Sequence, residues 1–416
     1  MSETLNVYFD QTRVGSLSID DRRQFSFQYS KKWLTSPDAF QISISLPMQE
    51  EIFSNDKVKS FFSNLLPEST VRELIAKRLK ISSKNDFMLL KRIGGECAGA
   101  VTILPESEIP ESPNQYRYRL LSDEQLAGLI KDIPRLPLLA GQEGVRISLA
   151  GAQEKLALFY KDPSFYIPEN GAPSNFILKP SMAHYQYSIE NECFCMMLAK
   201  AVDLNVPPVE IVQKDTQKVL LIKRYDRVMD NDVLKRLHQE DFCQAMGLPH
   251  ELKYQAEGGP GLGACFDLVR AYSANPIKDF QQLLHWVFFN YLIGNMDGHA
   301  KNLSFIYQAR QIRVAPFYDI LCTDIYEGLS QKLAMGIGGE NRPEWIMERH
   351  WKGFAEEIKV NNPVLKKRLL EFCLKVIGTI DRIHADFINM YQQNRLLEDI
   401  ITAIKKRSSR TLKQFD

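Results

Sequence analysis

The period of the hydrophobic pattern changes along the chain, and this change limits the fold more than any other feature. Within the first 45 residues apolar and polar side chains alternate, as at Leu5, Val7 and Phe9. Alternation with a period of two predicts antiparallel strands. Beyond Asp226 the apolar residues mostly recur with the three- to four-residue spacing of helices. The sequence therefore predicts an α+β fold with a strand-rich beginning and a mostly helical end.

Individual segments refine this prediction. Helical spacing predicts helices at residues 58–66, 70–79, 117–137, 190–201, 240–246, 263–272, 280–296, 362–377 and 380–397. Apolar alternation or short apolar runs predict strands at 98–104, 176–179, 219–225, 302–307, 312–315 and 332–337, and a pair of strands within 145–157 joined by a turn at 150–152.

The length of 416 residues favours two or three subdomains. A loop rich in proline, glutamate and serine at 105–113 is the first predicted linker. We therefore expect an accessory α+β module at 1–104, a second β-rich region at 105–225 and a helical region at 226–416.

Charge and cysteine content exclude several classes of protein. With 52 Lys and Arg against 51 Asp and Glu, the net charge of +1 excludes a protein that mainly coats nucleic acid. The seven cysteines lie in apolar runs without a CxxC pair, which predicts reduced, mostly buried thiols and a cytoplasmic protein. The start of the chain lacks the pattern of a signal peptide, and the uncharged run 280–296 is too short and polar to span a membrane.

The most informative segment is 294–302, where an apolar run ends in a polar loop. The loop contains Asp297 and, five residues later, Asn302, and a short predicted hairpin then leads to Tyr318 and Asp319. Kinase catalytic loops and their metal-binding aspartate have this order and spacing. Phosphoryl transfer needs a carboxylate that accepts the proton of the attacking hydroxyl, and hard oxygen ligands for Mg²⁺.

These requirements assign a role to each residue. Asp297 is the predicted base, and Asn302 and Asp319 are the predicted Mg²⁺ ligands. Lys301 is placed to neutralise the γ-phosphate of ATP.

Earlier segments supply the other expected parts of a kinase. Residues 148–155 hold small side chains, which phosphate needs in order to approach backbone N–H groups. Lys179 ends an apolar strand and would reach the α- and β-phosphates, with Glu192 of the next predicted helix as its partner. The linker would then be Lys223, Arg224 and Tyr225, with a backbone able to bond an adenine edge.

Each of these residues also has an ordinary structural explanation. Asp and Asn favour turns, Gly151 fits a hairpin, and Lys179 and Glu192 fit solvated positions. The order of the parts, rather than any single part, favours a kinase. The sequence lacks GxxxxGK[ST], HExxH and GxSxG, which argues against a P-loop NTPase, a zinc hydrolase and a serine hydrolase. The glycine-rich run 259–263 is predicted to be a turn before a helix.

With these residues in hand, the sequence resembles the HipA family of bacterial serine/threonine kinases, the toxins of type II toxin–antitoxin modules linked to persistence. The resemblance extends over nearly the whole chain, and it rests on the segments 61–67, 99–102, 146–155, 239–241, 297–302 and 316–320. It implies a bilobal protein-kinase-like fold, with a β-rich N-terminal lobe, an accessory α+β module and a mostly helical C-terminal lobe.

The resemblance also implies the residues that contact ATP and Mg²⁺. The implied ATP-binding residues are Ala150, Gly151, Ala152, Gln153, Glu154, Lys155, Lys179, Lys223, Arg224, Tyr225, His299, Ala300, Lys301, Asn302, Tyr318 and Asp319. Ser148 matches the autophosphorylated serine of the family, where the phosphate ejects the phosphate-binding loop and inactivates the kinase. Asn295 and Ile320 replace the His and Gly of eukaryotic kinases, which puts a eukaryote-like regulation in doubt.

Partners follow from the resemblance as well. It implies a small HipB-like helix-turn-helix antitoxin, operator DNA bound only through the antitoxin complex, no membrane, and a protein substrate that is an aminoacyl-tRNA synthetase. Two rival functions stay open: a small-molecule phosphotransferase, and a catalytically silent kinase-like co-repressor. Basic residues at 366–368 and 405–413 are interpreted as a solvated helix face and a frayed tail rather than as a DNA contact.

Overall fold

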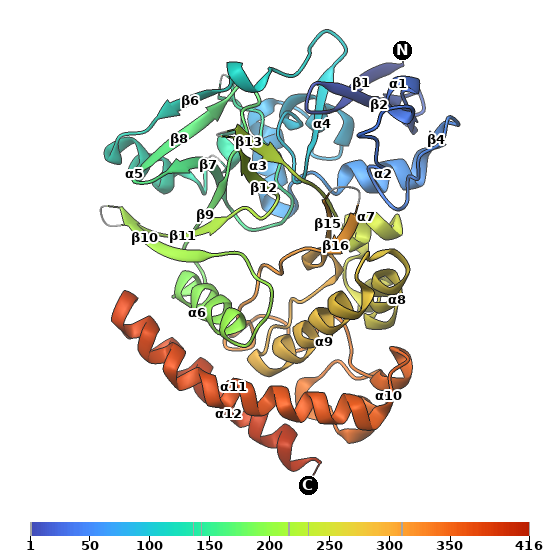
Figure 1. Cartoon of the computed structure of the whole chain (residues 1–416). Coiled ribbons are helices and arrows are strands. Elements are labelled where there is room, and N and C mark those ends of the chain that lie inside the picture. The colour runs from blue at the N-terminus through green and yellow to red at the C-terminus, as the bar shows by residue number, and fades with distance from the viewer. Residues whose placement is uncertain are drawn as a thin grey trace. The chain divides into compact units, whose positions relative to one another are not determined.

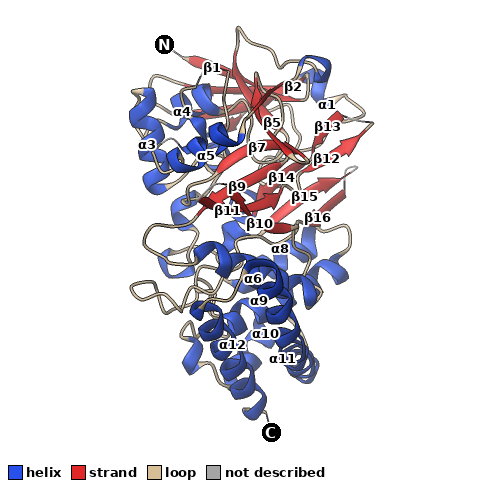
Figure 2. Cartoon of the chain, turned by 90° about the vertical axis from the view of Figure 1, so that its left-hand side faces the viewer, coloured by secondary structure: helices blue, strands red, loops and turns tan. Residues whose placement is uncertain are grey.

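The computed structural model describes residues 2–135, 137–142, 144–214, 217–231, 233–308 and 311–415. The chain divides into two compact units. Unit 1 consists of residues 1–180, 212–250 and 305–310, and unit 2 consists of residues 181–211, 251–304 and 311–416. Figure 2 shows that most strands belong to the first unit and that the second is mostly helical.

Unit 1 begins with a five-stranded antiparallel sheet. Its strands, in spatial order, are β4 (Phe53–Ser54), β3 (Phe25–Tyr29), β2 (Thr12–Ile19), β1 (Glu3–Phe9) and β5 (Val101–Pro105). The helices of this part of the chain are α1 (Lys31–Leu34), α2 (Asn55–Ser63), α3 (Ser69–Leu79) and α4 (Asp86–Ile93). Period-two alternation places Leu5, Val7 and Leu17 in the core, where each is fully buried.

A six-stranded sheet follows (Figure 1). Its order is β10 (Val209–Lys214), β11 (Gln217–Lys223), β9 (Phe176–Pro180), β7 (Leu156–Lys161), β8 (Ser164–Glu169) and β6 (Arg117–Leu120). Helix α5 (Asp123–Asp132) packs against β11. The remaining strands are β12 (Arg227–Asp230), β13 (Val233–Arg236), β14 (His238–Asp241), β15 (Ser304–Gln308) and β16 (Gln311–Val314), and α7 (Phe242–Met246) follows β14.

Unit 2 is built around α9, the long apolar helix. The helices of this unit are α6 (Ser188–Ala201), α8 (Leu262–Tyr272), α9 (Pro276–Ile293), α10 (Glu348–Glu357), α11 (Asn362–Tyr391) and α12 (Arg395–Lys413). Short 3₁₀ turns lie in both units, at Pro113–Gln115, Pro137–Leu139, His250–Leu252, Gln255–Glu257, Ala300–Asn302 and Pro343–Trp345. Fully buried Phe288 of α9 has its ring 5.8 Å from Trp351 and 5.9 Å from Phe372.

Most predicted elements exist, but the prediction of one helix over 117–137 is wrong. The chain instead forms strand β6 and then helix α5. The boundary is a capping box, in which the Ser122 hydroxyl accepts from the Gln125 N–H at 3.1 Å and the Gln125 side chain accepts from the Ser122 N–H at 3.0 Å. Serine followed three residues later by glutamine is a sequence signal for the start of a helix. The helical spacing of apolar residues over 117–137 obscured this signal. Leu136, within the same predicted helix, lies outside the described residues.

The predicted pair of strands at 145–157 is also wrong. Only β7, which begins at Leu156, is a strand there. The preceding residues bond to distant segments instead of to each other, since Ile147 pairs with Glu96 and Gly151 with Pro67 as isolated bridges. Local alternation cannot reveal partners that lie far away in the sequence.

The C-terminal helices differ from the prediction in their boundaries. One helix, α11, runs through Gly378 where two helices were predicted. A Cβ added at Gly378 would meet nothing within 4 Å, and a glycine inside a helix costs only about 1 kcal/mol relative to alanine. The predicted frayed tail at 405–413 is wrong, since these residues belong to helix α12, which continues to Lys413, packs along α11 and buries Ser408 and Thr411. The predicted strand at 332–337 does not form.

The burial predicted for the cysteines is confirmed, because all seven are buried. Among the described residues, no helix is both long enough and apolar enough to cross a membrane.

Candidate active site

Helix α9 delivers the polar loop that the sequence singled out. The helix ends at Gly294, whose φ of 77° lies in the left-handed region. A Cβ atom added at Gly294 would lie only 2.5 Å from a carboxylate oxygen of Asp324. The Gly294 carbonyl accepts from the N–H groups of Thr323 at 3.0 Å and Asp324 at 3.1 Å. Glycine is therefore required here, and it joins the start of the loop to the segment that follows Asp319.

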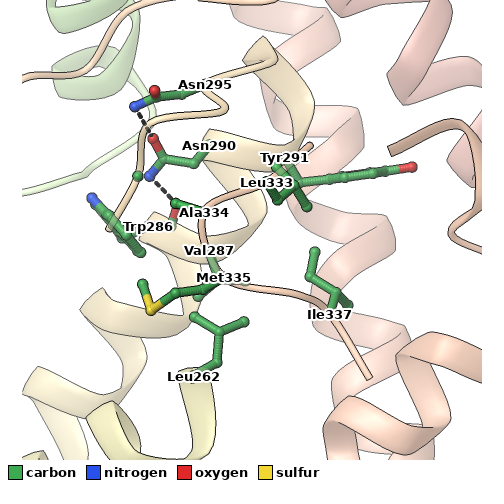
Figure 3. A pocket seen from close by; sticks show the side chains of 11 residues that line it. Leu262, Trp286, Val287, Asn290, Tyr291, Asn295, Leu333, Ala334, Met335 and Ile337 are labelled. Atoms are coloured by element: carbon green, nitrogen blue, oxygen red, sulfur yellow. Dashed lines mark hydrogen bonds between the residues drawn. The ribbon is translucent and has the colours of Figure 1, made fainter. Parts of the chain in front are cut away.

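Asn295 connects the two predicted acidic residues. Its side-chain N–H₂ donates to the Asn290 side chain at 2.6 Å and to the backbone carbonyl of Asp319 at 3.3 Å. Its side-chain oxygen accepts from the backbone N–H of Asp297 at 3.1 Å. Asn290 is itself held by the Trp286 carbonyl at 2.8 Å, as Figure 3 shows. Because Asn290 and Asn295 are buried, this network holds the loop rigidly.

A second contact draws the same segments together. The Tyr318 hydroxyl donates to the Lys301 carbonyl at 2.8 Å and lies 3.2 Å from the Ser304 hydroxyl. Two separate hydrogen bonds thus join residues 295–302 to residues 318–319.

The three predicted catalytic residues differ in exposure. Asp297 is exposed, with one carboxylate oxygen held by the Tyr254 hydroxyl at 2.7 Å. Asp319 is half-buried and has a left-handed φ of 54°. Asn302 is buried, and its side-chain oxygen has no hydrogen-bond partner among the described residues. A buried oxygen without a partner costs free energy unless a ligand satisfies it.

This donor set fits Mg²⁺. An amide oxygen and a carboxylate are hard ligands, and Mg²⁺ bound to a nucleotide usually takes only one or two protein carboxylates. Over the described ranges no group of three or more His, Cys, Asp or Glu side chains is placed to hold a metal ion.

The remaining predicted loop residues are mostly buried. His299, Ala300 and Lys301 are each less than a tenth exposed. A cavity of about 20 Å³ lies beside the loop, between α9 and residues 333–337 (Figure 3). It has room for about one water molecule, so it is too small for a nucleotide.

In unit 1 the predicted phosphate loop is held from two sides. Ser148 is fully buried, its hydroxyl donates to the Leu65 carbonyl at 2.7 Å, and its N–H donates to the Glu96 carbonyl at 2.7 Å. The Gly151 carbonyl accepts from the Glu68 N–H at 3.2 Å. A kinase cannot reach Ser148 in this conformation, so its phosphorylation requires the loop to leave this position.

Two predicted lysines are also placed within unit 1. The Lys155 ammonium donates to the Ala150 carbonyl at 2.8 Å, which ties the loop to its own end. Lys179 is buried in β9 and pairs in register with Leu220 of β11. Glu192 is buried in α6 of unit 2, and its pairing with Lys179 stays a prediction.

The predicted linker needs a correction at Arg224. Its backbone N–H already donates to the Asn175 carbonyl at 2.9 Å, and its side chain is buried. That N–H is therefore not available to an adenine edge. Local sequence did not reveal this, because Asn175 lies far from Arg224 along the chain.

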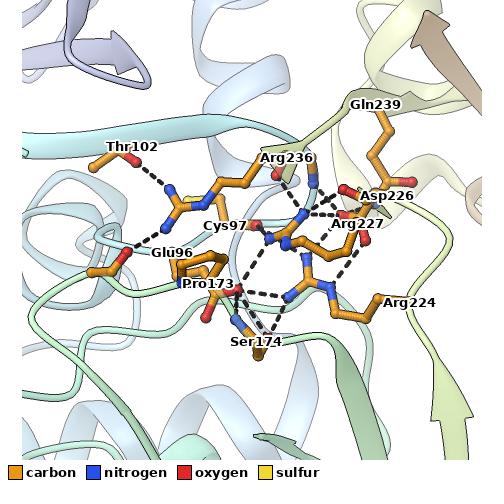
Figure 4. Close-up of polar contacts among 12 residues, drawn as sticks. Glu96, Cys97, Thr102, Pro173, Ser174, Arg224, Asp226, Arg227, Arg236 and Gln239 are labelled. Atoms are coloured by element: carbon orange, nitrogen blue, oxygen red, sulfur yellow. Dashed lines mark hydrogen bonds and ion pairs between the residues drawn. The ribbon is translucent and has the colours of Figure 1, made fainter. Parts of the chain in front are cut away.

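Figure 4 shows what the Arg224 side chain does instead. Glu96 and Asp226 form a buried ion cluster with Arg224 and Arg227, at nitrogen–oxygen distances of 2.8–3.1 Å. Burial alone would raise the pKa of Asp226, but the two guanidinium charges hold that pKa well below its usual range. The backbone carbonyl of Glu96 also accepts a hydrogen bond from the Ser148 N–H. The ion cluster therefore anchors the start of the predicted phosphate loop.

Sequence reasoning missed Asn290 and Tyr254. A polar residue on an otherwise apolar helix could have drawn attention to Asn290. Tyr254 carries no sequence signal, because its contact to Asp297 joins two segments 43 residues apart.

Comparison with known proteins gives consistent results. A family model described as the HipA N-terminal domain matches residues 5–104, and one described as the HipA-like C-terminal domain matches residues 147–380. A Sinorhizobium fredii protein, Y4mE, whose name assigns it only provisionally to the kinases, is 38% identical over 97% of both chains. The serine/threonine-protein kinase toxin HipA of Shewanella oneidensis is 30% identical over 94% of both chains.

A solved structure agrees as well. A chain of the complex of Shewanella oneidensis HipA, HipB and operator DNA superposes with a TM-score of 0.83 and 29% identity, over 99% of this chain and 96% of that one.

Proposed function

Because the chain belongs to the HipA family, we propose that it transfers the γ-phosphate of ATP to a serine of a protein target and thereby arrests growth. Two observations carry the proposal: Asn295 ties Asp297 to Asp319, and the same loop contains Asn302, whose buried side-chain oxygen has no hydrogen-bond partner among the described residues. Kinase chemistry needs a base and two oxygen ligands in one place.

Each residue has a stated role in this proposal. Asp297 accepts the proton of the substrate hydroxyl, and Asn302 and Asp319 hold Mg²⁺, which would neutralise charge on the phosphates. Lys179 and Lys301 bind phosphate oxygens of ATP. Because little covalent chemistry falls to the protein, positioning and charge stabilisation would supply most of the rate.

The proposal extends to the regulation and the partners of the chain. Ser148 is the proposed autophosphorylation site. Because Ser148 is buried, the loop would have to take a different position once the serine carries a phosphate. The proposed target is an aminoacyl-tRNA synthetase, whose phosphorylation would stop translation. A HipB-like antitoxin would neutralise the chain, and operator DNA would bind through that complex; the presence of HipB and DNA in the similar structure supports this.

The decisive experiment combines phosphoproteomics with one variant. Brief induction of the wild-type chain should add phosphate to a serine of one synthetase and stop growth, whereas Asp297→Gln should do neither at an unchanged melting temperature. Asp297 is exposed, so the substitution has no packing cost. Label from γ-³²P-ATP in Asp297→Gln would refute the base, and labelled sugars or antibiotics would favour a small-molecule phosphotransferase.

A further inference from the structure

The hydroxyl of Tyr254 lies 2.7 Å from one carboxylate oxygen of Asp297. Proton transfer to a base requires that the base be oriented toward the attacking hydroxyl at hydrogen-bond distance. An exposed aspartate rotates freely about its side-chain bonds unless a neighbour holds it. We infer that Tyr254 is a positioning residue, which fixes one oxygen of Asp297 so that the other faces the substrate hydroxyl.

The backbone of Asp297 is held independently of its side chain. Its N–H donates to the Asn295 side chain at 3.1 Å, and its carbonyl accepts from the His299 N–H at 2.9 Å. These bonds set the position of the Cα atom but leave the carboxylate orientation open. The tyrosine hydroxyl supplies the constraint that the backbone contacts lack.

Tyr254 is itself well supported. Its ring packs edge-on against His299 with centroids 5.2 Å apart, and the Lys253 ammonium lies 5.3 Å from its centroid. Its carbonyl accepts from the N–H groups of Glu257 at 3.0 Å and Gly259 at 2.9 Å. The aromatic contact therefore joins Tyr254 to the same loop that carries Asp297.

Gln255, the residue after Tyr254, connects Tyr254 to the segment that contains Ala334 and Gly336. The Gln255 N–H donates to the Ala334 carbonyl at 3.1 Å, and its side-chain oxygen accepts from the Gly336 N–H at 2.8 Å. The Ala334 N–H in turn donates to the carbonyl of Met296, directly before Asp297, at 3.0 Å. Tyr254 and Asp297 are thus held in one closed network of hydrogen bonds.

The glycine-rich turn after Tyr254 explains why this network is possible. A Cβ at Gly259 would lie 2.3 Å from the Leu252 carbonyl oxygen and 2.7 Å from that of Tyr254. A Cβ at Gly261 would lie 2.8 Å from the Gln255 side-chain nitrogen. The turn does precede a helix, as predicted, and its glycines also let the chain close tightly around Tyr254 and Gln255.

The inference rests on the proposed function, and its test separates the two. Tyr254→Phe keeps the ring against His299 and removes only the hydroxyl. Tyr272→Phe, at an exposed site at the end of α8, is the matched control. Initial rates of ³²P transfer from γ-³²P-ATP to casein and to the chain itself are measured as a function of ATP concentration, with melting temperature as the check on folding.

Tyr254→Phe should lower kcat about tenfold and leave the KM for ATP unchanged, the size expected for one lost hydrogen bond to a charged group. An unchanged kcat would overturn the inference. So would a rise in kcat/KM, because that result means the hydroxyl blocks the base. A wild-type chain that transfers no phosphate would overturn the proposed function instead.

A second measurement does not depend on activity. In protein labelled with [ζ-¹³C]tyrosine, the signal lost in Tyr254→Phe identifies this residue. That signal should shift in Asp297→Asn, because a neutral amide replaces the acceptor, while the Tyr272 signal should stay in place. An unmoved Tyr254 signal would show that the contact is absent in solution and would overturn the inference.

Discussion

Glu240→Gln should make the chain more stable above neutral pH. Glu240 is almost completely buried and accepts hydrogen bonds from the Ser43 hydroxyl at 2.6 Å and the Ile44 N–H at 3.0 Å, as well as from the Tyr307 hydroxyl. Burial outweighs these bonds and raises the pKa of Glu240 from 4.5 to about 7. Because the folded-state pKa lies above the unfolded one, the folded chain loses stability as pH rises from 4.5 through 7.

The size of the effect follows from the shift. One pKa unit corresponds to about 1.4 kcal/mol, so a carboxyl raised by roughly 2.5 units costs about 3 kcal/mol at alkaline pH and nothing below pH 4. Glutamine keeps the acceptor oxygen and carries no charge. The free energy of unfolding of Glu240→Gln, relative to wild type, should therefore rise by about 3 kcal/mol between pH 4 and pH 8.

Urea unfolding followed by circular dichroism at several pH values measures this difference. Glu106→Gln, at an exposed site in unit 1, serves as the control and should show no pH-dependent difference. A Glu240→Gln difference that stays constant from pH 4 to pH 8, or that falls as pH rises, would refute the reasoning.

Four further substitutions, in three predictions, test unit 2. Gly294→Ala should destabilise the chain by about 2–4 kcal/mol, because it combines a left-handed φ with an overlap on Asp324, whereas Gly378→Ala in an open stretch of α11 should stabilise it by about 1 kcal/mol; thermal unfolding compares the two. Asn302→Ala should raise the Mg²⁺ concentration needed for ATP to stabilise the chain about tenfold, as a thermal-shift titration would show, and an unchanged titration would exclude Asn302 as a ligand. Arg407→Met should cost about 1–3 kcal/mol in urea unfolding, since it removes an ion pair to Asp324 and a hydrogen bond to the Leu292 carbonyl at 2.9 Å.

The two units differ in how well the sequence predicts them. Strong, uninterrupted periodicity predicted α6, α8 and α9 to within a few residues, because one apolar face must be buried whatever it packs against. The segment 145–157 misled the prediction because its partners, Glu96 and residues 65–68, come from elsewhere in the chain. The residues next to this segment in the sequence give no information about such distant partners.

The catalytic loop illustrates the same division. Spacing alone singled out Asp297, Asn302 and Asp319, since the chemistry requires these residue types in this order. It did not indicate that buried Asn295 joins Asp297 to Asp319, or that Tyr254 holds the Asp297 carboxylate.

The amino-acid sequence by itself determined most helices of unit 2, the burial of the cysteines and the residue types predicted for phosphoryl transfer, because periodicity and side-chain chemistry are local properties. Only the tertiary structure decided that Ser148 is buried, that the Arg224 N–H is already bonded and that Tyr254 reaches Asp297. Those outcomes depend on hydrogen bonds between residues far apart in the chain, and such bonds exist only after the chain has folded.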